Sequence, residues 1–140
     1  MKRAVLIGGG GHAAACIESL SGVCGLELIG YTDRKASDSS SFKGISFLGS
    51  DDCLSSVAKI ADFAVLGVGQ ILTAENRQKA IANAQKFGLQ VIGFNAVTAH
   101  VSNLSNVHPT VQIMHMAFIN SGVLIGAHCI LNTRCIVEHD

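Results

Sequence analysis

An aliphatic residue recurs at every sixth position along the last part of the chain. These positions are Val101, Val107, Ile113, Ile119, Ile125, Leu131 and Val137. The residue four places after each of the first six is small or compact, at Ser105, Val111, Ala117, Val123, Cys129 and Cys135. A period of six fits neither a helix, with about 3.6 residues per turn, nor a strand, with a repeat of about two. It is typical of a hexapeptide-repeat parallel β-helix, in which three hexapeptides complete one coil.

Six complete hexapeptides run from Val101 to Ile136, which predicts two coils. One coil cannot bury its inward aliphatic residues alone, so the coils must stack. Helices of this kind are left-handed. The register continues through Val137–Asp140, and a stub of two coils would leave unpaired strand edges. We therefore expect the native protein to continue for several more coils after Asp140, which makes this chain a fragment.

The first ninety-five residues follow a different pattern, in which short apolar runs alternate with helical segments. Alternation of this kind predicts a small parallel sheet with right-handed crossovers. We expect two domains, an α/β Rossmann-like domain over 1–95 and the first coils of a left-handed parallel β-helix over 96–140. The predicted strands are 4–7, 26–32, a short edge segment within 44–49, 63–68 and 90–94. The predicted helices are 13–20, a segment capped by Asp51 or Asp52 and ending near Lys59, and 73–87 with Gly88 after it.

A glycine-rich turn joins the first predicted strand to the first helix. The sequence Gly8-x-Gly10-x-x-Ala13, with Asp33 twenty residues later, matches the dinucleotide fingerprint. Glycines let the backbone approach a phosphate, and the start of the helix offers free N–H groups and the positive end of its dipole. Asp33 ends the second strand, where a carboxylate accepts hydrogen bonds from a ribose or a base. The alternative is that the glycines form only a tight turn and that Asp33 caps a loop.

Two further features lie at the same edge of the predicted sheet. His12 is not required by a dinucleotide fingerprint, and at the helix start it is placed to touch a ligand or to be simply solvated. Gly67 and Gly69 form a second glycine-rich loop after the strand 63–68, although ordinary loop chemistry also explains them. Two such loops at the carboxyl ends of parallel strands define a crevice where open α/β sheets bind ligands.

His139 is the candidate catalytic residue of the repeat segment. It lies between Glu138 and Asp140, and a neighbouring carboxylate fixes the tautomer of an imidazole and raises its basicity. The other histidines of the repeat lack such paired carboxylates, and no zinc motif has the observed spacing. We therefore expect a general base at His139 and no metal.

Composition narrows the classes of function. The chain has 140 residues, 49% of them hydrophobic and 14% charged, with a formal net charge of zero. A chain this apolar buries a core and is not disordered. The sequence has no basic block of the kind that binds nucleic acid, and no apolar run reaches the roughly 20 residues of a membrane span. We expect no signal peptide, because glycines end the apolar run Ala4–Ile7 too early. The five cysteines form no C-x-x-C pair, so we expect buried thiols of a cytoplasmic protein, with Cys129 and Cys135 acting as compact hydrophobes.

Taken together and in this order, the motifs resemble the bacterial sugar O- and N-acyltransferases of the sialic-acid, legionaminic-acid and bacillosamine pathways (NeuD/PglD type). The resemblance covers the whole chain. The loop 70–73 is more similar to the sialic- or legionaminic-acid branch. The matching stretches are Ile7–His12, Tyr31–Asp33, Leu66–Gln70, Asn76–Arg77, Ile130–Thr133 and Val137–Asp140.

The resemblance implies that the N-terminal domain binds a sugar or UDP-amino-sugar acceptor and that the β-helix trimerises to bind acetyl-CoA between neighbours. It makes His139 the catalytic base and Asp140 the acidic residue that supports it. Arg34 departs from the second acidic residue that often follows the matching aspartate, which leaves the acceptor open. No residue of this chain is implied for most acetyl-CoA contacts. The acceptor contacts that the resemblance implies are Gly10, Gly11, His12, Asp33 and Gly69.

The implied reaction is direct acyl transfer. His139 removes a proton from a sugar amine or hydroxyl as that atom attacks the thioester carbonyl of acetyl-CoA, and backbone N–H groups stabilise the oxyanion. A different class remains open, namely an NAD-binding or nucleotide-sensing Rossmann module whose solenoid serves only for oligomerisation.

Overall fold

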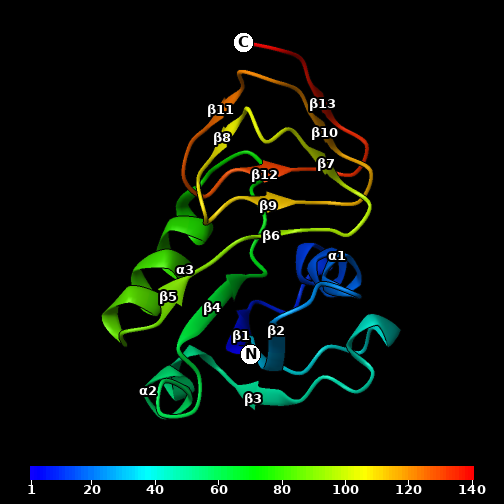
Figure 1. Ribbon diagram of the computed structural model, residues 1–140. Coiled ribbons are helices and arrows are strands. Elements are labelled where there is room, and N and C mark those ends of the chain that lie inside the picture. The colour runs from blue at the N-terminus through cyan, green and yellow to red at the C-terminus, as the bar shows by residue number, and fades with distance from the viewer. The chain divides into compact units, whose positions relative to one another are not determined.

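The computed structural model describes residues 1–140, which divide into two compact units (Figure 1). The first, here called the sheet unit, comprises residues 1–18 and 24–92. The second, here called the coil unit, comprises residues 19–23 and 93–140. No helix of the structure combines the length and apolar character that crossing a bilayer requires.

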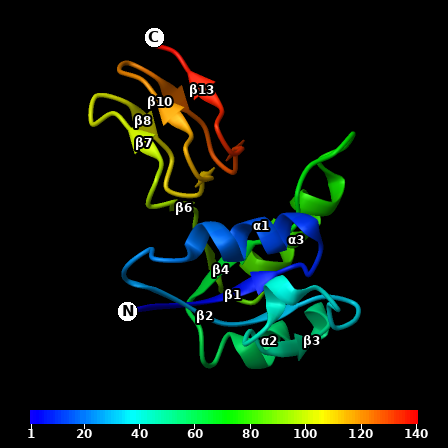
Figure 2. The same ribbon diagram turned by 90° about the vertical axis from the view of Figure 1, so that its right-hand side faces the viewer.

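The sheet unit contains a five-stranded parallel sheet in the order β3-β2-β1-β4-β5 (Figure 1), and Figure 2 shows β1 between β2 and β4. β1 is central, and its residues from Ala4 to Ile7 are at most 1% exposed, as expected for a strand covered on both faces. Ile7 pairs with both Thr32 and Leu66, so the carboxyl ends of β1, β2 and β4 meet at one edge. The strands are β1 Lys2–Ile7, β2 Leu26–Thr32, β3 Phe47–Gly49, β4 Phe63–Leu66 and β5 Gln90–Val91.

Helices cover both faces of this sheet. α1 lies on one side, and α2 and α3 lie on the other (Figure 1). On the second side, Val5 and Ile7 of β1 pack with Leu54 of α2 and the alanines Ala80 and Ala84 of α3. Alanines on the inner side of α3 let its backbone approach the sheet closely. The helical segments are α1 Gly11–Leu20, α2 Leu54–Val57, α3 Glu75–Lys86 and the 3₁₀ turns η1 Ser40–Phe42 and η2 Asp51–Cys53.

The helix predicted from Asp51 or Asp52 to Lys59 is wrong in its form. A 3₁₀ turn precedes α2, which ends at Val57. Neither aspartate is an N-cap, because Ser50 precedes the 3₁₀ turn and Cys53 precedes α2, and neither of these side chains makes a capping bond. The Asp51 carboxylate instead accepts hydrogen bonds from the side chains of Thr32 and Asn83. The carboxylate that was predicted to cap the helix therefore makes hydrogen bonds to β2 and α3 instead.

The predicted single strand 90–94 is also wrong. β5 ends at Val91, and a separate strand, β6 Phe94–Asn95, pairs with β9 of the coil unit. Gly93 N–H donates to the Pro109 carbonyl, and a Cβ at Gly93 would collide with the Val111 backbone. The hexapeptide register therefore begins at Asn95, six residues before Val101. The start of the repeat cannot be recognised from the sequence, because Asn95 is polar and exposed where the other hexapeptides have an aliphatic residue.

The coil unit confirms the hexapeptide prediction. Ile119 pairs in parallel with Val101 and with Val137, so strands stack every eighteen residues, three hexapeptides apart. The inward aliphatic residues form one cluster, with Ile113 and Ile119 fully buried at its centre. The strands are β7 His100–Val101, β8 Asn106–Val107, β9 Gln112–Ile113, β10 Phe118–Ile119, β11 Leu124–Ile125, β12 Ile130–Leu131 and β13 Ile136–Val137.

The corners of the coils repeat as regularly as the strands. From Met116 onward every sixth residue has a positive φ between 59° and 77°, at Met116, Gly122, His128, Arg134 and Asp140. Two of these corners close with a hydrogen bond from the residue after the corner to the residue two before it, at Ala117 and Cys135. A left-handed residue at the third position of such a turn favours glycine. Only Gly122 is a glycine, so the positions of the corners cannot be predicted from the residue types.

The thiols differ in burial from what the sequence predicts. None of the five cysteines forms a disulfide, and only Cys16 is buried. Cys135 packs half-buried against the cluster of the coil unit, as a compact hydrophobe does. Cys129 is exposed, so its predicted burial is wrong. It precedes β12, which is the outermost strand of its sheet and has no neighbouring strand on one side.

Candidate functional site

A cavity of about 440 Å³ lies at the carboxyl edge of the sheet, between the two glycine-rich loops. We call it the glycine-loop cavity. It is lined by Gly8–His12, by Asp33 at the end of β2, and by Gly67–Gly69 at the end of β4. The structure therefore brings together all five residues predicted to contact the acceptor, which are Gly10, Gly11, His12, Asp33 and Gly69.

The first loop needs glycine at two positions for steric reasons. Gly8 has a φ of +111°, outside the range that side chains favour, and its N–H donates to the Thr32 carbonyl. A Cβ at Gly9 would lie 2.8 Å from Asp33 Oδ2. The absence of that Cβ lets Gly9 N–H donate to the same oxygen at 2.8 Å. The loop and the carboxylate thus fix each other.

Asp33 accepts a second bond from the N–H of Arg34, at 2.6 Å to Oδ1. Each carboxylate oxygen accepts more than one hydrogen bond, so both retain capacity for a ligand. The Asp33 carboxylate is therefore held in a fixed orientation at the cavity wall, where it can accept hydrogen bonds from a ligand.

Gly10 and Gly11 differ from Gly8 and Gly9. A Cβ at either of them would meet no atom within 4 Å. They lie where α1 begins, and the first hydrogen bond of the helix runs from Ala14 N–H to the Gly10 carbonyl at 3.1 Å. The N–H groups at the start of a helix have no partner within it and favour anions. The open side of this loop is suited to a phosphate.

His12 is held from two sides. Its ring lies against Gly69, where a Cβ would be 3.1 Å from His12 Cβ, and its Nε2 lies 3.5 Å from the sulfur of Cys16. Cys16 also donates to the Leu66 carbonyl at 3.8 Å. Burial raises the pKa of the Cys16 thiol to about 12, although the nearby positive charge of Arg77 opposes the shift. The thiol therefore stays protonated beside His12 at neutral pH.

The second loop depends on two residues that were not among the predicted contacts. A Cβ at Gly67 would lie 2.8 Å from the Cβ of Ala13, so close packing of α1 against this loop requires glycine there. The guanidinium of buried Arg77 donates to the Val68 carbonyl at 2.6 Å and fixes the loop from α3. Both residues belong to motifs that the sequence shows, but their roles depend on tertiary contacts.

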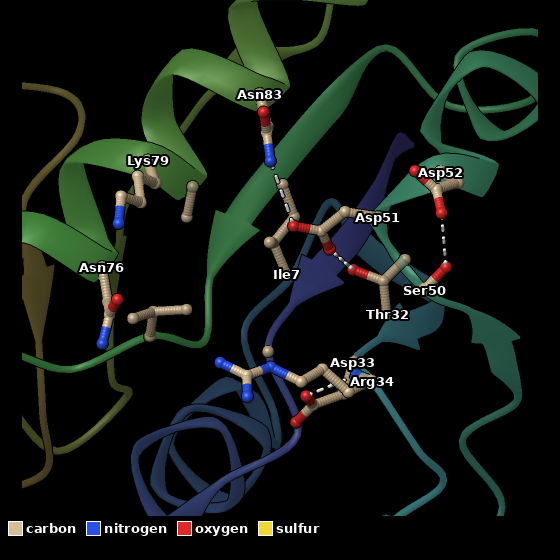
Figure 3. A pocket seen from close by; sticks show the side chains of 13 residues that line it. Ile7, Thr32, Asp33, Arg34, Ser50, Asp51, Asp52, Asn76, Lys79 and Asn83 are labelled. Carbon is tan, nitrogen blue, oxygen red and sulfur yellow. Dashed lines mark hydrogen bonds between the residues drawn. The ribbon is translucent and has the colours of Figure 1, made fainter.

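A second cavity of about 430 Å³ adjoins the first and shares Gly8, Asp33, Val68 and Asn76 with it (Figure 3). We call it the aspartate cavity. Its remaining lining residues are Ile7, Thr32 and Arg34 from β1 and the end of β2, Ser50, Asp51 and Asp52 around η2, and Lys79, Ala80 and Asn83 from α3.

A hydrogen-bonded group forms one wall of the aspartate cavity. Thr32 donates to Asp51 Oδ1 at 2.9 Å, and Asn83 donates to Asp51 Oδ2 at 3.2 Å. Figure 3 shows Asp51 between these two side chains. Asp52 accepts from the Ser50 hydroxyl at 3.3 Å.

One feature of this wall is visible in the sequence. Asn76, Lys79 and Asn83 recur at spacings of three and four along α3, which places them on one side of the helix. A polar stripe of that kind is usually read as a solvated surface. Only the position of η2 reveals that it lines a cavity.

The coil unit carries the predicted catalytic pair. His139 Nδ1 lies 3.1 Å from Asp140 Oδ2, and the two side chains are 69% and 83% exposed. With Nδ1–H donating to the carboxylate, Nε2 is left as the proton acceptor. Glu138 does not take part, because its carboxylate accepts from the Asn120 amide at 3.0 Å. Of the two flanking carboxylates, only Asp140 contacts the histidine.

Two neighbouring groups place Asp140. Its N–H donates to the Ser121 carbonyl at 3.1 Å, and a Cβ at Gly122 would collide with its carboxylate. Gly122 thus leaves the space that Asp140 occupies. No group of three or more His, Cys, Asp or Glu side chains is arranged to hold a metal ion.

The chain is similar to several solved structures. No protein-family model and no curated protein matches it. The whole chain is similar to a histidine-to-alanine variant of GDP-perosamine N-acetyltransferase from Caulobacter crescentus, solved in complex with CoA and GDP-perosamine. The identity is 28%, the TM-score is 0.86, and the match covers 64% of that chain. PerB from the same organism, also with CoA and GDP-perosamine, matches at 28% identity with a TM-score of 0.84, again over all of this chain and 64% of that one.

A third similar structure is the acetyltransferase domain of PglB from Neisseria gonorrhoeae in complex with acetyl coenzyme A. It is 22% identical with a TM-score of 0.84, over 99% of this chain and 65% of that one. This likeness establishes the fold only. The chain therefore spans just under two thirds of the length of these structures. Its parallel strands and these neighbours together fit a left-handed parallel β-helix.

Proposed function

We propose that this protein is a sugar acyltransferase that moves an acetyl group from acetyl-CoA to an amine or hydroxyl of a nucleotide-linked sugar. The observation that carries the proposal is the match, over the whole chain, to a sugar N-acetyltransferase solved with CoA and GDP-perosamine. The two adjoining cavities at the sheet edge support it independently, since they offer space for an extended polar ligand. The NeuD/PglD type and the sialic- or legionaminic-acid pathway are the finer form of this proposal.

In the proposal each part of the chain has its own task. The sheet unit serves as the Rossmann-like acceptor domain, which the parallel strand order β3-β2-β1-β4-β5 favours. The coil unit forms the first coils of the acyltransferase β-helix. The resemblance further implies a homotrimer in which acetyl-CoA binds between neighbours, and no residue of this chain is assigned to that contact.

The acceptor lies in the glycine-loop cavity. The N–H groups at Gly10, Gly11 and His12 donate to a phosphate oxygen where α1 begins. Asp33 accepts from a hydroxyl or amine of the ligand, because its carboxylate is already oriented by Gly9. Gly69 keeps the cavity open beside the His12 ring.

His139 performs the proton transfer. Asp140 holds Nδ1–H, so Nε2 takes the proton from the acceptor atom as that atom attacks the thioester carbonyl. The new bond to the acetyl carbon forms, the carbon–sulfur bond breaks, and the proton passes to the departing CoA sulfur. Positioned base catalysis of this kind contributes about 10² to 10⁴-fold.

The test is a product mass spectrum. Acetyl-CoA is incubated with the protein and a panel of GDP- and UDP-linked amino-sugars and free nonulosonic acids. The expected result is one acetyl group added to a nucleotide-linked sugar, with His139→Ala reducing turnover and leaving acceptor affinity unchanged. Unchanged turnover in His139→Ala would remove the histidine from the mechanism.

The dinucleotide fingerprint also favours a second candidate function, that of an NAD-binding module. A thermal-shift titration with NAD beside a nucleotide-linked amino-sugar separates the two. The proposal expects stabilisation by the nucleotide-linked sugar. Stabilisation by NAD with no response to any nucleotide-linked sugar would favour the module instead.

A further inference from the structure

The aspartate cavity has the construction of a site for a planar heterocycle. Its apolar lining side chains are Ile7, Val68 and Ala80, and the lining side chains around them are polar or charged. Ile7 and Ala80 are 1% and 4% exposed and belong to the packed core, so the half-buried Val68 presents more of the apolar surface. A flat base packs against an apolar side chain of this kind and presents its polar edge to the hydrogen-bonded wall, an arrangement common in small-molecule sites.

The charges of the cavity indicate which part of a nucleotide enters it. Asp33, Asp51 and Asp52 contribute three carboxylates to the lining, against the two cations Arg34 and Lys79. A diphosphate there would face net negative charge, whereas the adjoining glycine-loop cavity offers N–H groups at the start of α1. The uncharged nucleoside therefore suits the aspartate cavity, and the phosphates suit the glycine loop.

Asp51 offers a specific acceptor pattern. Thr32 and Asn83 each donate to one of its oxygens and fix the plane of the carboxylate. Two further acceptor positions remain, one on each oxygen. A matching ligand presents two neighbouring donors on one edge.

Among the common bases only guanine presents such an edge, with N1–H beside the N2 amino group. Uracil offers one N–H between two carbonyl oxygens, so a carboxylate would gain one bond and face a carbonyl with its other oxygen. Adenine and cytosine place a ring acceptor beside their amino group, which a carboxylate also repels. The ammonium of Lys79, which lines the same cavity, is a donor for the carbonyl oxygen of guanine.

We propose that the aspartate cavity binds the base of the nucleotide-linked acceptor and that Asp51 selects guanine over uracil. This inference rests on the proposed function, because it assumes a nucleotide-linked acceptor. It adds a site, a base class and a specificity-determining residue that the acetyl-transfer reaction does not itself require.

Isothermal titration calorimetry of the chain with GDP and with UDP tests the proposal. GDP is expected to bind at least about tenfold more tightly than UDP, since one bidentate base contact discriminates by about ten- to a hundredfold. Asp51→Asn replaces one acceptor oxygen with a donor and is expected to abolish most of this ratio by weakening GDP alone. The ratio of two affinities measured on one sample does not depend on how much of a variant is folded.

The matched control is Asp62→Asn, which removes the same charge from an exposed position outside both cavities. It is expected to preserve the ratio. Equal or tighter binding of UDP by the native chain would overturn the guanine assignment while leaving the proposed function intact. An equal loss of both nucleotides in Asp51→Asn would overturn the role of Asp51. Failure of both nucleotides to bind the native chain would instead contradict the nucleotide-linked acceptor itself.

Discussion

The two units of this chain differ in how their sequences specify structure. In the coil unit a single rule repeats, with one inward aliphatic residue and one compact residue per hexapeptide, and the strands pair at a constant separation of eighteen residues. In the sheet unit no rule repeats, and each strand, loop and helix has its own sequence. Both candidate ligand cavities lie among those non-repeating loops. Repetition makes a fold easy to recognise, and departures from repetition carry the binding chemistry.

The largest effect is expected in the core of the coil unit. Ile119→Ala removes a fully buried side chain between two stacked strands and should lower the free energy of unfolding by about 2–5 kcal/mol. Ile136→Ala is the matched control, because Ile136 is 66% exposed on the paired strand β13 and should cost within about 0.5 kcal/mol. Urea unfolding measures both variants. Equal losses would show that the inward and outward positions of the coil are wrongly assigned.

The next effect separates two adjacent glycines of the sheet unit. Gly9→Ala places a Cβ 2.8 Å from Asp33 Oδ2 and should cost about 1–3 kcal/mol through the forced shift. Gly10→Ala meets open space and should change stability by at most about 0.5 kcal/mol. Thermal and urea unfolding compare the two. If Gly10→Ala is the more damaging substitution, the loop geometry is incorrect.

Burial of the Cys16 thiol makes the stability of the sheet unit depend on pH. Its pKa is about 12 in the folded chain, above the ordinary value of 9.0, so the protonated thiol favours the folded state. Its contribution is complete below pH 9 and is lost as the pH rises from 9 toward 12, by at most about 1.4 kcal/mol per pH unit.

Unfolding of the native chain and of Cys16→Ala between pH 8 and pH 10.5 tests this expectation. The stability difference between them should shift in favour of Cys16→Ala as the pH rises. Cys24→Ala, at an exposed thiol, is the control. A difference between native chain and Cys16→Ala that stays constant with pH would show that Cys16 ionises freely when folded.

The smallest effect concerns the corners of the coil unit. Arg134 has a φ of 60°, which a glycine adopts without strain. Arg134→Gly should raise the free energy of unfolding by about 0.5 kcal/mol, because part of the gain is offset by the greater freedom of glycine in the unfolded chain. Gly122→Ala at the equivalent corner should act in the opposite direction. Urea unfolding decides the sign, and a destabilised Arg134→Gly would place an unrecognised contact at that side chain.

The sequence predicts the coil unit from Val101 onward because each inward position is an unambiguous aliphatic residue. It misplaces the start of the repeat, since Asn95 occupies the register of an inward residue but is polar. It also misjudges Cys129, whose exposure depends on the edge position of its strand. The periodicity of a sequence predicts which side of a strand a residue faces. It does not predict whether a neighbouring strand covers that residue.

For the sheet unit the sequence predicts the glycine-loop cavity and misses the aspartate cavity. Gly10, His12 and Asp33 belong to one local motif whose chemistry is known from the strand–turn–helix geometry. Asp51 and Asn83 are thirty-two residues apart, and their contact is set by the packing of η2 and α3. Without that packing, Asp51 reads as a helix cap and Asn83 as a solvated side chain.

The central claim is that the sheet unit binds the acceptor while the coil unit supplies the base. Steady-state kinetics of acetyl transfer to a nucleotide-linked amino-sugar, with Gly10→Val beside His139→Ala, tests it most directly. Gly10→Val narrows the glycine-loop cavity and should raise KM for the acceptor with little change in kcat. His139→Ala should lower kcat by about 10² to 10⁴-fold at an unchanged KM. A reversed pattern, or a kcat that does not depend on His139, would contradict the account.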